Sequence, residues 1–367
     1  MDMATKRLVK IHPKFKLNGS SYTTETLRAQ AYEFIKEGEP YQEAVGNFLL
    51  DWLNDSKYIL THTSGSTGAP KPIKILKQHM FHSALATAKY FSLPEKTTAL
   101  LCLPVGFIAG KMMIARALVL GWHLDMAIPK SNPLDAVFRR YDFCAMTPFQ
   151  LDNSLGRLHL IKKLIVGGGA VSPALLQRLK EVDTKIYETY GMTETVTHIA
   201  VRRINSKKEK QQLIPFKTMP KVTVSVDERS CLIIKAKAVS RDPVITNDVV
   251  ELLSHKRFIW LGRIDNVVNS GGIKLFPEQI EEKLATVIDV PFFVGGVPDE
   301  QLGQKLVLFV EHRQPYAFAK ADIAQLELDK YEIPKAVYTL ASFDRTDNGK
   351  LRRGQTIRRF LIAQKAH

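Results

Sequence analysis

The chain has 367 residues, of which 45% are hydrophobic, and its formal net charge at pH 7 is +15. Its 21 glycines and 18 prolines are an ordinary share, which excludes a low-complexity chain. The length suffices for a sizeable core and exceeds one ordinary domain, so we expect two domains. The basic balance favours an anionic partner without choosing among nucleic acid, anionic membrane and phosphorylated small molecules.

The first half of the chain alternates between helical and strand patterns. Two helices between residues 23 and 53 precede a strand (58–63), a helix (77–93), a strand (98–105), a helix closed by Gly121 (110–121), strands (122–128, 141–147 and 162–169), a helix (172–182) and a strand (185–191). Ser172 and Pro173 are a typical N-cap and first helical residue. The alternation predicts an α/β fold with a mostly parallel sheet.

After about residue 216 the pattern changes to short alternating strands. Strands at 221–227, 231–237 and 257–265 predict a small antiparallel β subdomain. They are followed by a helix (277–287), strands (291–299 and 305–312), a helix (321–330) and a basic tail. We place a domain boundary between Asp265 and Asn266, which gives an N-terminal domain (1–265) and a smaller α+β C-terminal domain (266–367).

The cysteines and the apolar segments indicate the cellular compartment of the chain. The cysteines are isolated and lack metal or redox spacing, which predicts a reduced, cytoplasmic chain: Cys102, Cys144 and Cys231. The start "MDMATKRLVKIHPKFK" lacks the apolar core of a secretory signal. The most apolar stretch is interrupted by Arg116, His123 and Asp125, so we expect no membrane span.

The segment "THTSGSTGAPKP" (61–72) lies between a predicted strand and a predicted helix. Its spacing is not that of a Walker A loop, yet its glycines, hydroxyls and lysine suit a phosphate: Thr63, Ser64, Gly65, Ser66, Thr67, Gly68 and Lys71. Such segments are also common as surface turns. The residues alone leave both interpretations open.

Two further segments follow predicted strands. In "YETYGMTETVTHIA" (187–200), Tyr190 suits stacking on a base, and Glu194 offers the carboxylate oxygen that Mg²⁺ prefers. The alternative is a strand end with a solvated acidic turn. In "VGGGAVSP" (166–173), Gly168 and Gly169 follow the strand, where glycine pairs often form simple turns.

Together with "ITNDVVEL…FIWLGRIDNVVNSGGIKLFPEQIEEKL" and "DRTDNGKLRRGQ", these segments resemble, in this order, the signatures of the acyl-adenylate-forming superfamily. The resemblance spans residues 61 to about 354. It implies that 63–71 is the phosphate loop, that Gly168, Gly169 and Tyr190 frame the adenine, and that Gly191 belongs to the nucleotide site. It also implies that Thr193 contacts phosphate, that Glu194 binds Mg²⁺, and that Asp248 and Arg263 hold the ribose hydroxyls.

The resemblance also implies a reaction in two steps. A carboxylate attacks the α-phosphate of ATP and releases pyrophosphate, and the thiol of coenzyme A then displaces AMP. Lys350 would stabilise the charge of the first step, and Asp265 would be the hinge of a mobile C-terminal domain. Gly271, Gly272 and Lys274 would border the path of the coenzyme A arm, although a β-turn explains the glycines equally well.

The chain departs from the family at several points. The phosphate loop usually follows a longer N-terminal region, so we expect a trimmed N-terminal subdomain. Asn247 replaces the glycine of the usual Thr-Gly-Asp, and the substrate loop "LPVGFIAGK" lacks the usual histidine, with Phe107 nearby. The acidic residue of amino-acid-activating members is also absent, which argues against an amino-acid substrate.

Within the superfamily, "LPVGFIAGKMMIARALVLGW" and "YGMTETVTHIA" resemble the o-succinylbenzoate–CoA ligases of menaquinone synthesis in a shortened bacterial form. That acid has two carboxylates, and only one reacts. Arg116 interrupts an apolar helix and needs a buried anion or a path to solvent, so we favour it as a ligand of the second carboxylate. Lys111, Thr197 and His198 are further candidates, and solvation of Lys111 or a structural acid beside Arg116 are the alternatives.

Rival functions remain open at this point. A nucleic-acid-binding protein would fit the net charge, but the basic residues are spread along the chain and no known nucleic-acid motif is present. A catalytically inactive homologue is disfavoured because Lys350, Glu194 and Asp248 are all retained. A ligase for another aryl or fatty acid is not excluded. The isolated histidines predict no metal site and are expected to be structural or solvated: His62, His79, His82 and His123.

Overall fold

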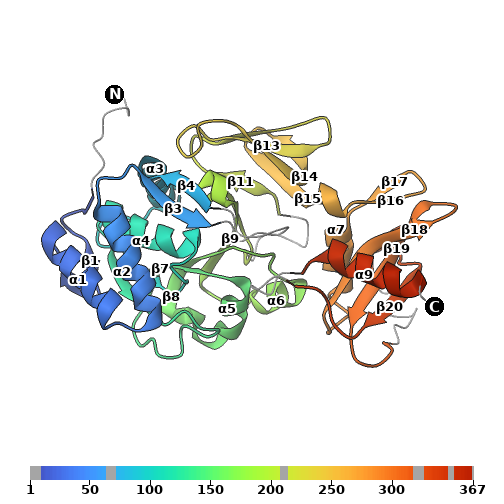
Figure 1. Ribbon diagram of the computed structural model, residues 1–367, viewed down its shortest axis with the longest axis horizontal. Coiled ribbons are helices and arrows are strands. Elements are labelled where there is room, and N and C mark those ends of the chain that lie inside the picture. Colours follow the sequence, from blue (N-terminus) through green and yellow to red (C-terminus); the bar gives the residue numbers. More distant parts are fainter. Residues whose placement is uncertain (1–9, 63–71, 207–213, 317–325, 346–350, 366–367) are drawn as a thin grey trace.

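The computed structural model describes residues 10–62, 72–206, 214–316, 326–345 and 351–365. These residues form two lobes, which lie side by side along the long axis of the molecule (Figure 1). We call residues 10–263 the large lobe and residues 268–365 the small lobe. The domain boundary predicted at 265–266 lies between the last strand of one sheet and the first strand of the next, and it stays a prediction.

One sheet of 13 strands runs through the described part of the large lobe. Its parallel section has the order β1–β6–β5–β7–β8–β9, and β2 (Ser20–Ser21) pairs with its outer edge. The parallel strands are β1 (Lys16–Leu17), β5 (Thr98–Leu101), β6 (His123–Met126), β7 (Tyr141–Met146), β8 (Ile161–Val166) and β9 (Lys185–Gly191). The parallel α/β fold predicted from the alternation is confirmed.

The antiparallel strands continue this sheet. β10 pairs antiparallel with β9, and the order then runs β11–β15–β14–β13–β12. The bounds are β10 (His198–Arg203), β11 (Phe216–Thr218), β12 (Thr223–Val226), β13 (Cys231–Lys235), β14 (Val244–Ser254) and β15 (Arg257–Arg263). The small antiparallel region predicted from the sequence therefore hydrogen-bonds to the parallel section through β11 and β10. The pattern did not predict β10, β11 or β14.

Side-chain alternation divides the core between the two faces of the parallel strands. Ala99 and Leu101 of β5 face one cluster, whereas Leu100 and the following Cys102 face the other. The first cluster includes side chains of α1 (Thr24–Lys36), α2 (Pro40–Leu53), α3 (Lys77–Phe91) and α4 (Ile108–Leu120). The second includes α5 (Pro148–Asn153) and α6 (Pro173–Arg178). A sheet covered on both faces explains the nearly continuous apolar runs of its strands.

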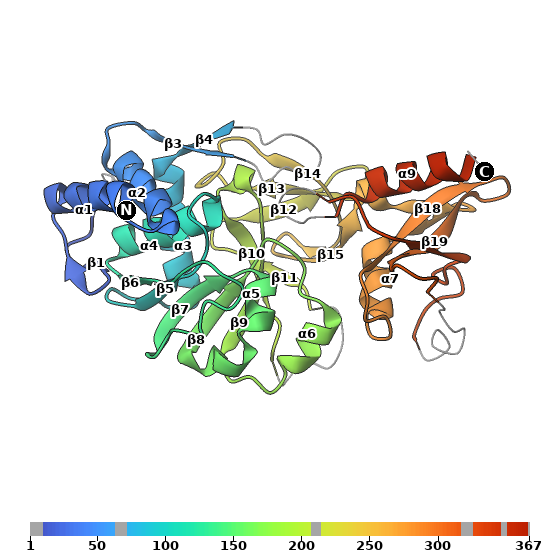
Figure 2. The ribbon, with the colours of Figure 1, turned by 60° about the horizontal axis from the view of Figure 1, so that its bottom comes forward.

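The residues that were predicted to begin or end helices do so in the structure. Ser172 accepts a hydrogen bond from the backbone N–H of Leu175, and Pro173 opens α6, although this helix ends sooner than expected. Gly121 ends α4 with a φ of 68°. Thr23 caps α1, and Pro40 opens α2. These first two helices lie at the end of the large lobe remote from the small lobe (Figure 2).

The segment 63–71 joins two strands, which corrects the expectation that it leads from a strand to a helix. β3 (Tyr58–His62) and β4 (Pro72–Leu76) pair antiparallel as a separate hairpin, and α3 begins directly after β4. The sequence pattern did not predict β4, because its residues, "PIKIL", are too few to show a period. The paired ends hold residues 62 and 72 opposite each other.

The small lobe has a sheet of its own. It has the order β17–β16–β19–β18, with β20 parallel to β19. The elements are β16 (Val268–Ser270), β17 (Ile273–Leu275), α7 (Pro277–Leu284), β18 (Phe292–Asp299), β19 (Gly303–Glu311), β20 (Ala336–Leu340) and α9 (Arg353–Lys365). The helix predicted at 321–330 is wrong for residues 326–330, which are not helical, and 321–325 lie outside the described residues. The predicted basic tail after residue 330 contains the strand β20, which was not predicted, and the helix α9.

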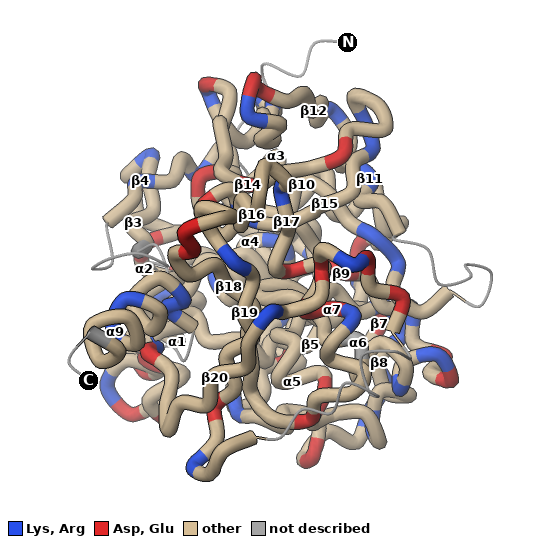
Figure 3. The backbone as a smooth tube through the Cα atoms, turned by 90° about the vertical axis from the view of Figure 1, so that its right-hand side faces the viewer, with Lys and Arg blue, Asp and Glu red and all other residues tan. Residues whose placement is uncertain are grey.

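Charged residues of both signs intersperse over the small-lobe end of the molecule (Figure 3). Among the described residues, no helix combines the length and the apolar character needed to cross a membrane.

Candidate active site

The parallel strands β7, β8 and β9 end at one edge of the sheet. The pairing of Met146 with Val166 and of Val166 with Glu188 aligns these ends. In open α/β sheets, ligands bind outside the carboxyl ends of the strands. The residues that we predicted to frame the adenine lie within or directly after these strands: Gly168, Gly169 and Tyr190.

The glycines after β8 divide into two kinds. Gly168 has a φ of +88° and no atom within 4 Å of an added Cβ, and Gly169 would meet only the Pro148 Cγ at 3.8 Å. Gly167 was not predicted as a site residue, yet its added Cβ would lie 2.4 Å from the Thr189 Oγ1. Gly167 is therefore required for packing, whereas Gly168 and Gly169 leave open space beside the backbone. Their adenine role stays a prediction.

The turn after β9 holds Thr193 and Glu194 in the 3₁₀ helix η3 (Thr193–Thr195). Thr195 ties this turn together, since its hydroxyl accepts from the Met192 N–H at 3.1 Å and donates to the Thr197 carbonyl at 2.9 Å. Val196 has φ 67° and ψ −49°, and the Thr197 N–H donates to the Thr195 carbonyl across it at 2.7 Å. This is the rare classic γ-turn, a strained conformation for a β-branched residue.

The same turn exposes one carboxylate, that of Glu194, which was predicted to bind Mg²⁺. Mg²⁺ bound with a nucleotide commonly uses one or two protein carboxylates together with phosphate oxygens and water. The described residues contain no group of three or more potential ligands, so any site here depends on the nucleotide. Gly191, predicted with the nucleotide site, has a packing reason as well, because its added Cβ would lie 2.4 Å from the Thr197 carbonyl.

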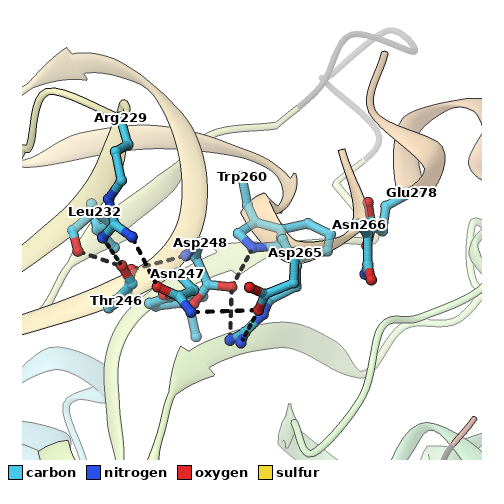
Figure 4. A network of polar contacts seen from close by, with 11 residues as sticks. Arg229, Leu232, Thr246, Asn247, Asp248, Trp260, Asp265, Asn266 and Glu278 are labelled. Atoms are coloured by element: carbon cyan, nitrogen blue, oxygen red, sulfur yellow. Dashed lines mark hydrogen bonds and ion pairs between the residues drawn. The ribbon is translucent and has the colours of Figure 1, made fainter. Parts of the chain in front are cut away.

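Asp248 is the centre of a polar network between β9, β14 and β15 (Figure 4). The Tyr190 hydroxyl donates to its Oδ2 at 2.6 Å, and the Trp260 indole N–H donates to its Oδ1 at 3.2 Å. The Arg263 Nη1 lies 3.8 Å from Oδ1. Asp248 and Arg263 are direct register partners on β14 and β15, which brings together two residues predicted to hold the ribose.

Tyr190 is held in this network from two sides. Its ring packs against Phe216 and Phe258, with centroids 5.8 and 5.3 Å away. Burial, followed by the adjacent carboxylate of Asp248, raises the pKa of Tyr190 well above 10. The phenol therefore stays protonated at neutral pH and donates to Asp248. No sequence pattern predicted this contact or that of Trp260, because both join residues that are distant in the chain.

Asp265, the predicted hinge residue, extends the polar network around Asp248. The Arg263 Nη2 donates to the Asp265 Oδ2 at 3.0 Å, and the Asn247 amide donates to the same oxygen at 3.4 Å. Asn247, where the family usually has glycine, also accepts from the Arg229 Nη1 at 3.4 Å. The unusual asparagine thus links the β12–β13 turn to the end of β15 (Figure 4).

Gly271 and Gly272 form the turn between β16 and β17. Their φ values are +59° and +82°, as the two central residues of a type I′ hairpin turn require. A side chain on Gly272 would meet no atom within 4 Å, so the backbone and not the available space restricts this position. Lys274 follows on β17 and is exposed. The β-turn alternative is confirmed for the glycines, and a role beside coenzyme A stays a prediction.

Arg116 lies at the centre of a second, buried polar cluster. Its side chain is 2% exposed, and its Nε, Nη1 and Nη2 donate to the Thr87 Oγ1 (3.3 Å), the Met113 Sδ (3.6 Å) and the Thr197 Oγ1 (3.0 Å). No carboxylate among the described residues pairs with it, and burial alone lowers its pKa to about 9. The structural acid considered as an alternative is therefore absent from the described part of the chain.

His198 completes the Arg116 cluster. Its Nδ1 lies 3.2 Å from the Thr197 Oγ1, and its Nε2 lies 3.5 Å from the Thr87 Oγ1. Burial, followed by the neighbouring Arg116, lowers the pKa of His198 well below 6.5, so the imidazole is neutral. The structure thus brings together Arg116, Thr197 and His198, and it adds Thr87, whose place on an otherwise ordinary helix gave no signal. Lys111 lies elsewhere and donates to the Leu60 carbonyl at 2.9 Å.

Two cavities are lined by residues of the large lobe. One of about 280 Å³ is lined by uncharged residues, including Tyr41 on α2 and the loop Leu103–Gly106 before α4. A smaller one, of about 30 Å³, is lined by His82 and His198 among others. The remaining predicted residues lie outside the described part of the structure: Thr63, Ser64, Gly65, Ser66, Thr67, Gly68, Lys71 and Lys350.

Comparisons with known proteins agree with this architecture. The 2-succinylbenzoate–CoA ligases of Geobacillus sp. (strain WCH70) and Bacillus pumilus are 25% and 24% identical, over 81% and 90% of this chain and 68% and 73% of theirs. A crystal structure of an acyl-CoA synthetase (AMP-forming)/AMP-acid ligase II-like protein from Dyadobacter fermentans is 36% identical, with a TM-score of 0.59 over 90% of this chain and 98% of that one.

The fold is shared with O-succinylbenzoate coenzyme A synthetase from Bacillus subtilis in complex with ATP and magnesium ion. The TM-score is 0.71 at 21% identity, over 81% of this chain and 69% of that one. The profile of the family described as AMP-binding enzyme matches residues 6–230, more than half of the chain, which confirms the superfamily predicted from the motifs. The chain belongs to the AMP-binding enzyme family.

Proposed function

We propose that the chain is an ATP-dependent, AMP-forming acid–CoA ligase whose substrate is 2-succinylbenzoate and whose product is 2-succinylbenzoyl-CoA, a step of menaquinone synthesis. Family membership and the ligase relatives support the reaction class. The single observation that carries the choice of acid is Arg116, a buried cation without an acidic partner among the described residues. Cytoplasmic location is part of the same proposal.

In the first half-reaction, a carboxylate oxygen bonds to the α-phosphorus of ATP and pyrophosphate leaves. Asp248 and Arg263 hold the ribose, which places the α-phosphate above the carboxyl ends of the parallel strands. Thr193 and the segment 63–71 donate to phosphate oxygens, and Lys350 stabilises the charge that develops in the transition state. Glu194 would hold Mg²⁺, which would neutralise phosphate charge.

In the second half-reaction, the coenzyme A thiolate attacks the acyl carbonyl and AMP leaves as the acyl–phosphate bond breaks. We propose that the small lobe turns about Asp265 between the two steps, which removes Lys350 and brings the turn Gly271–Gly272 and Lys274 beside the coenzyme A arm. The position of Asp265 between two separate sheets supports this assignment.

The second carboxylate of the acid is proposed to meet the Arg116 cluster. A buried charge without a partner is costly, and an incoming carboxylate compensates it. Thr197 is partly exposed and binds the guanidinium directly, so the acid would contact Thr197 and then Arg116. His198 is neutral and therefore adds no charge of its own. Lys111 stays a weaker candidate because it lies outside this cluster.

Acid-dependent pyrophosphate release tests the proposal. Purified protein with ATP, Mg²⁺ and a panel of acids should release pyrophosphate most rapidly with 2-succinylbenzoate, and coenzyme A should convert the product to a thioester. Release with another aryl or fatty acid, but none with 2-succinylbenzoate, would identify a different acid–CoA ligase. No release with any acid would refute the reaction class.

A further inference from the structure

Trp260 connects two parts of the molecule, and the proposed reaction gives it no role. Its indole N–H donates to the Asp248 Oδ1 at 3.2 Å, and its backbone carbonyl accepts from the Gln279 Nε2 of α7 at 3.3 Å. The indole points towards Asp248 in the close view of the network (Figure 4). One residue of β15 thus contacts both the carboxylate of the large lobe and a helix of the small lobe.

The Asp248 carboxylate is held by one donor on each oxygen. Tyr190 from β9 binds Oδ2, and Trp260 from β15 binds Oδ1. The backbone N–H of Asp248 is also engaged, because it donates to the Thr246 hydroxyl at 3.1 Å. Each carboxylate oxygen accepts about two hydrogen bonds, so one place on each oxygen stays open. A carboxylate fixed in this way presents two acceptors in one orientation.

We propose that Trp260 is a positioning residue for recognition of the ribose: its N–H fixes the orientation in which Asp248 accepts the two ribose hydroxyls. This inference rests on the proposed ribose role of Asp248. An indole suits the task because it only donates, so it does not compete with Asp248 for the hydroxyl protons. Arg263 is less suited, since its Nη2 binds Asp265 and its Nη1 is 3.8 Å from Asp248.

A purely structural role for Trp260 predicts a different outcome. The ring packs at the margin of the main core, so its loss would lower stability and weaken every nucleotide alike. Positioning through Asp248 would weaken only nucleotides that carry ribose hydroxyls. Comparing ATP with 2′,3′-dideoxy-ATP therefore separates the two roles, and the measurement needs no carboxylic acid.

The experiment is calorimetric titration of the full chain with ATP and with 2′,3′-dideoxy-ATP, each with Mg²⁺. Trp260→Phe should weaken ATP binding about tenfold and leave dideoxy-ATP unchanged. Trp260→His should restore most of the preference for ATP, since the His Nε2 occupies the place of the indole nitrogen on an equivalent five-membered ring. If Trp260→Phe does not fold, Trp260→Met, which also lacks a donor, takes its place.

Trp122 provides a matched control. Its indole nitrogen is buried and has no hydrogen-bond partner in the described part of the chain, so Trp122→Phe makes the same chemical change away from Asp248. The control should keep the wild-type preference for ATP. An unchanged preference in Trp260→Phe, or an equal loss in Trp122→Phe, would overturn the inference. If the wild-type chain binds both nucleotides equally, the ribose role of Asp248 itself fails.

Discussion

Two buried charged groups in the large lobe, Asp248 and Arg116, differ in how far the surrounding residues compensate their charge. Asp248 has donors on both carboxylate oxygens and a nearby arginine. Arg116 is buried more deeply, yet its partners are two threonine hydroxyls and a thioether, with a neutral histidine beyond them. The anion is therefore compensated within the protein, whereas among the described residues the cation is not.

Because of this difference, the two sites are suited to different kinds of ligand. A compensated carboxylate serves neutral hydroxyl groups, because it offers orientation without an unbalanced charge. An uncompensated guanidinium serves an anion, since the ligand supplies the charge that the fold omits. The cost of Arg116 in the free protein is thus the reason to assign it to substrate binding.

The largest effect is expected at Lys350, outside both of these regions. This result would show that Asp248 and Arg116 bind ligands and take no part in bond formation. Lys350→Ala should slow adenylation by about 10²–10³, equivalent to about 2.7–4 kcal/mol, because a charge-stabilising group is lost from the transition state. Rapid-quench assays should show lower kcat with little change in KM. Thioester formation from supplied acyl-adenylate should survive, and an equal fall in both steps would contradict the two-step assignment.

Arg116→Ala would sharpen the comparison through the substrate. A charge-assisted hydrogen bond is worth about 1.5–3 kcal/mol, so KM for 2-succinylbenzoate should rise roughly tenfold to a hundredfold. Benzoate, which lacks the second carboxylate, should be indifferent to the change where it is turned over. Lys111→Ala is the comparison on the same helix, and it should raise KM less than Arg116→Ala does, because Lys111 lies outside the cluster. Equal weakening of both acids would make Arg116 a structural residue.

Acid should destabilise the Arg116 region through His198. Its pKa is lowered in the folded state, so below its ordinary value of 6.5 the unfolded chain binds a proton that the folded chain does not. Stability should therefore fall by about 1.4 kcal/mol per pH unit as pH drops below 6.5. Tyr190, on the Asp248 side, stays protonated throughout this range. Denaturant melts of wild type and His198→Gln should differ in this slope, and identical slopes would contradict the assignment.

The smallest effect concerns stability at neutral pH. Arg116→Met keeps the length of the side chain and removes the uncompensated charge, so the free energy of unfolding should increase by about 1 kcal/mol while 2-succinylbenzoate binding is lost. Asp248→Leu, the equivalent change at the compensated charge, should decrease it. Urea melts would measure both. Destabilisation by Arg116→Met would mean that the threonines already compensate the guanidinium.

The sequence predicted those parts of the fold that have a local cause. Gly121 and Ser172 end and begin helices through their own backbone chemistry, and strands with apolar runs were found because both faces of the parallel section are covered. The continuity of the antiparallel section with the parallel section was not predictable, because it depends on pairing between β10 and β11. β4 was missed for a similar reason, since five residues carry no period.

The candidate site shows the same limit. Asp248 and Arg263 were found by resemblance, and the register of β14 and β15 places them together. Thr87 and Trp260 were missed because their roles arise from contacts between elements far apart in the chain. Gly167 was missed because its need for a small side chain comes from Thr189, on a neighbouring strand.

The exposure of the three tryptophans has a spectroscopic consequence. Trp52 and Trp122 are both 0% exposed, whereas Trp260 is partly exposed. Indole emission shifts with the polarity and charge around the ring, and Trp260 touches a carboxylate on one side while its own backbone contacts α7 of the small lobe. In a Trp52→Phe, Trp122→Phe chain it becomes the sole tryptophan, so its emission spectrum would report nucleotide binding and the rotation proposed for the small lobe.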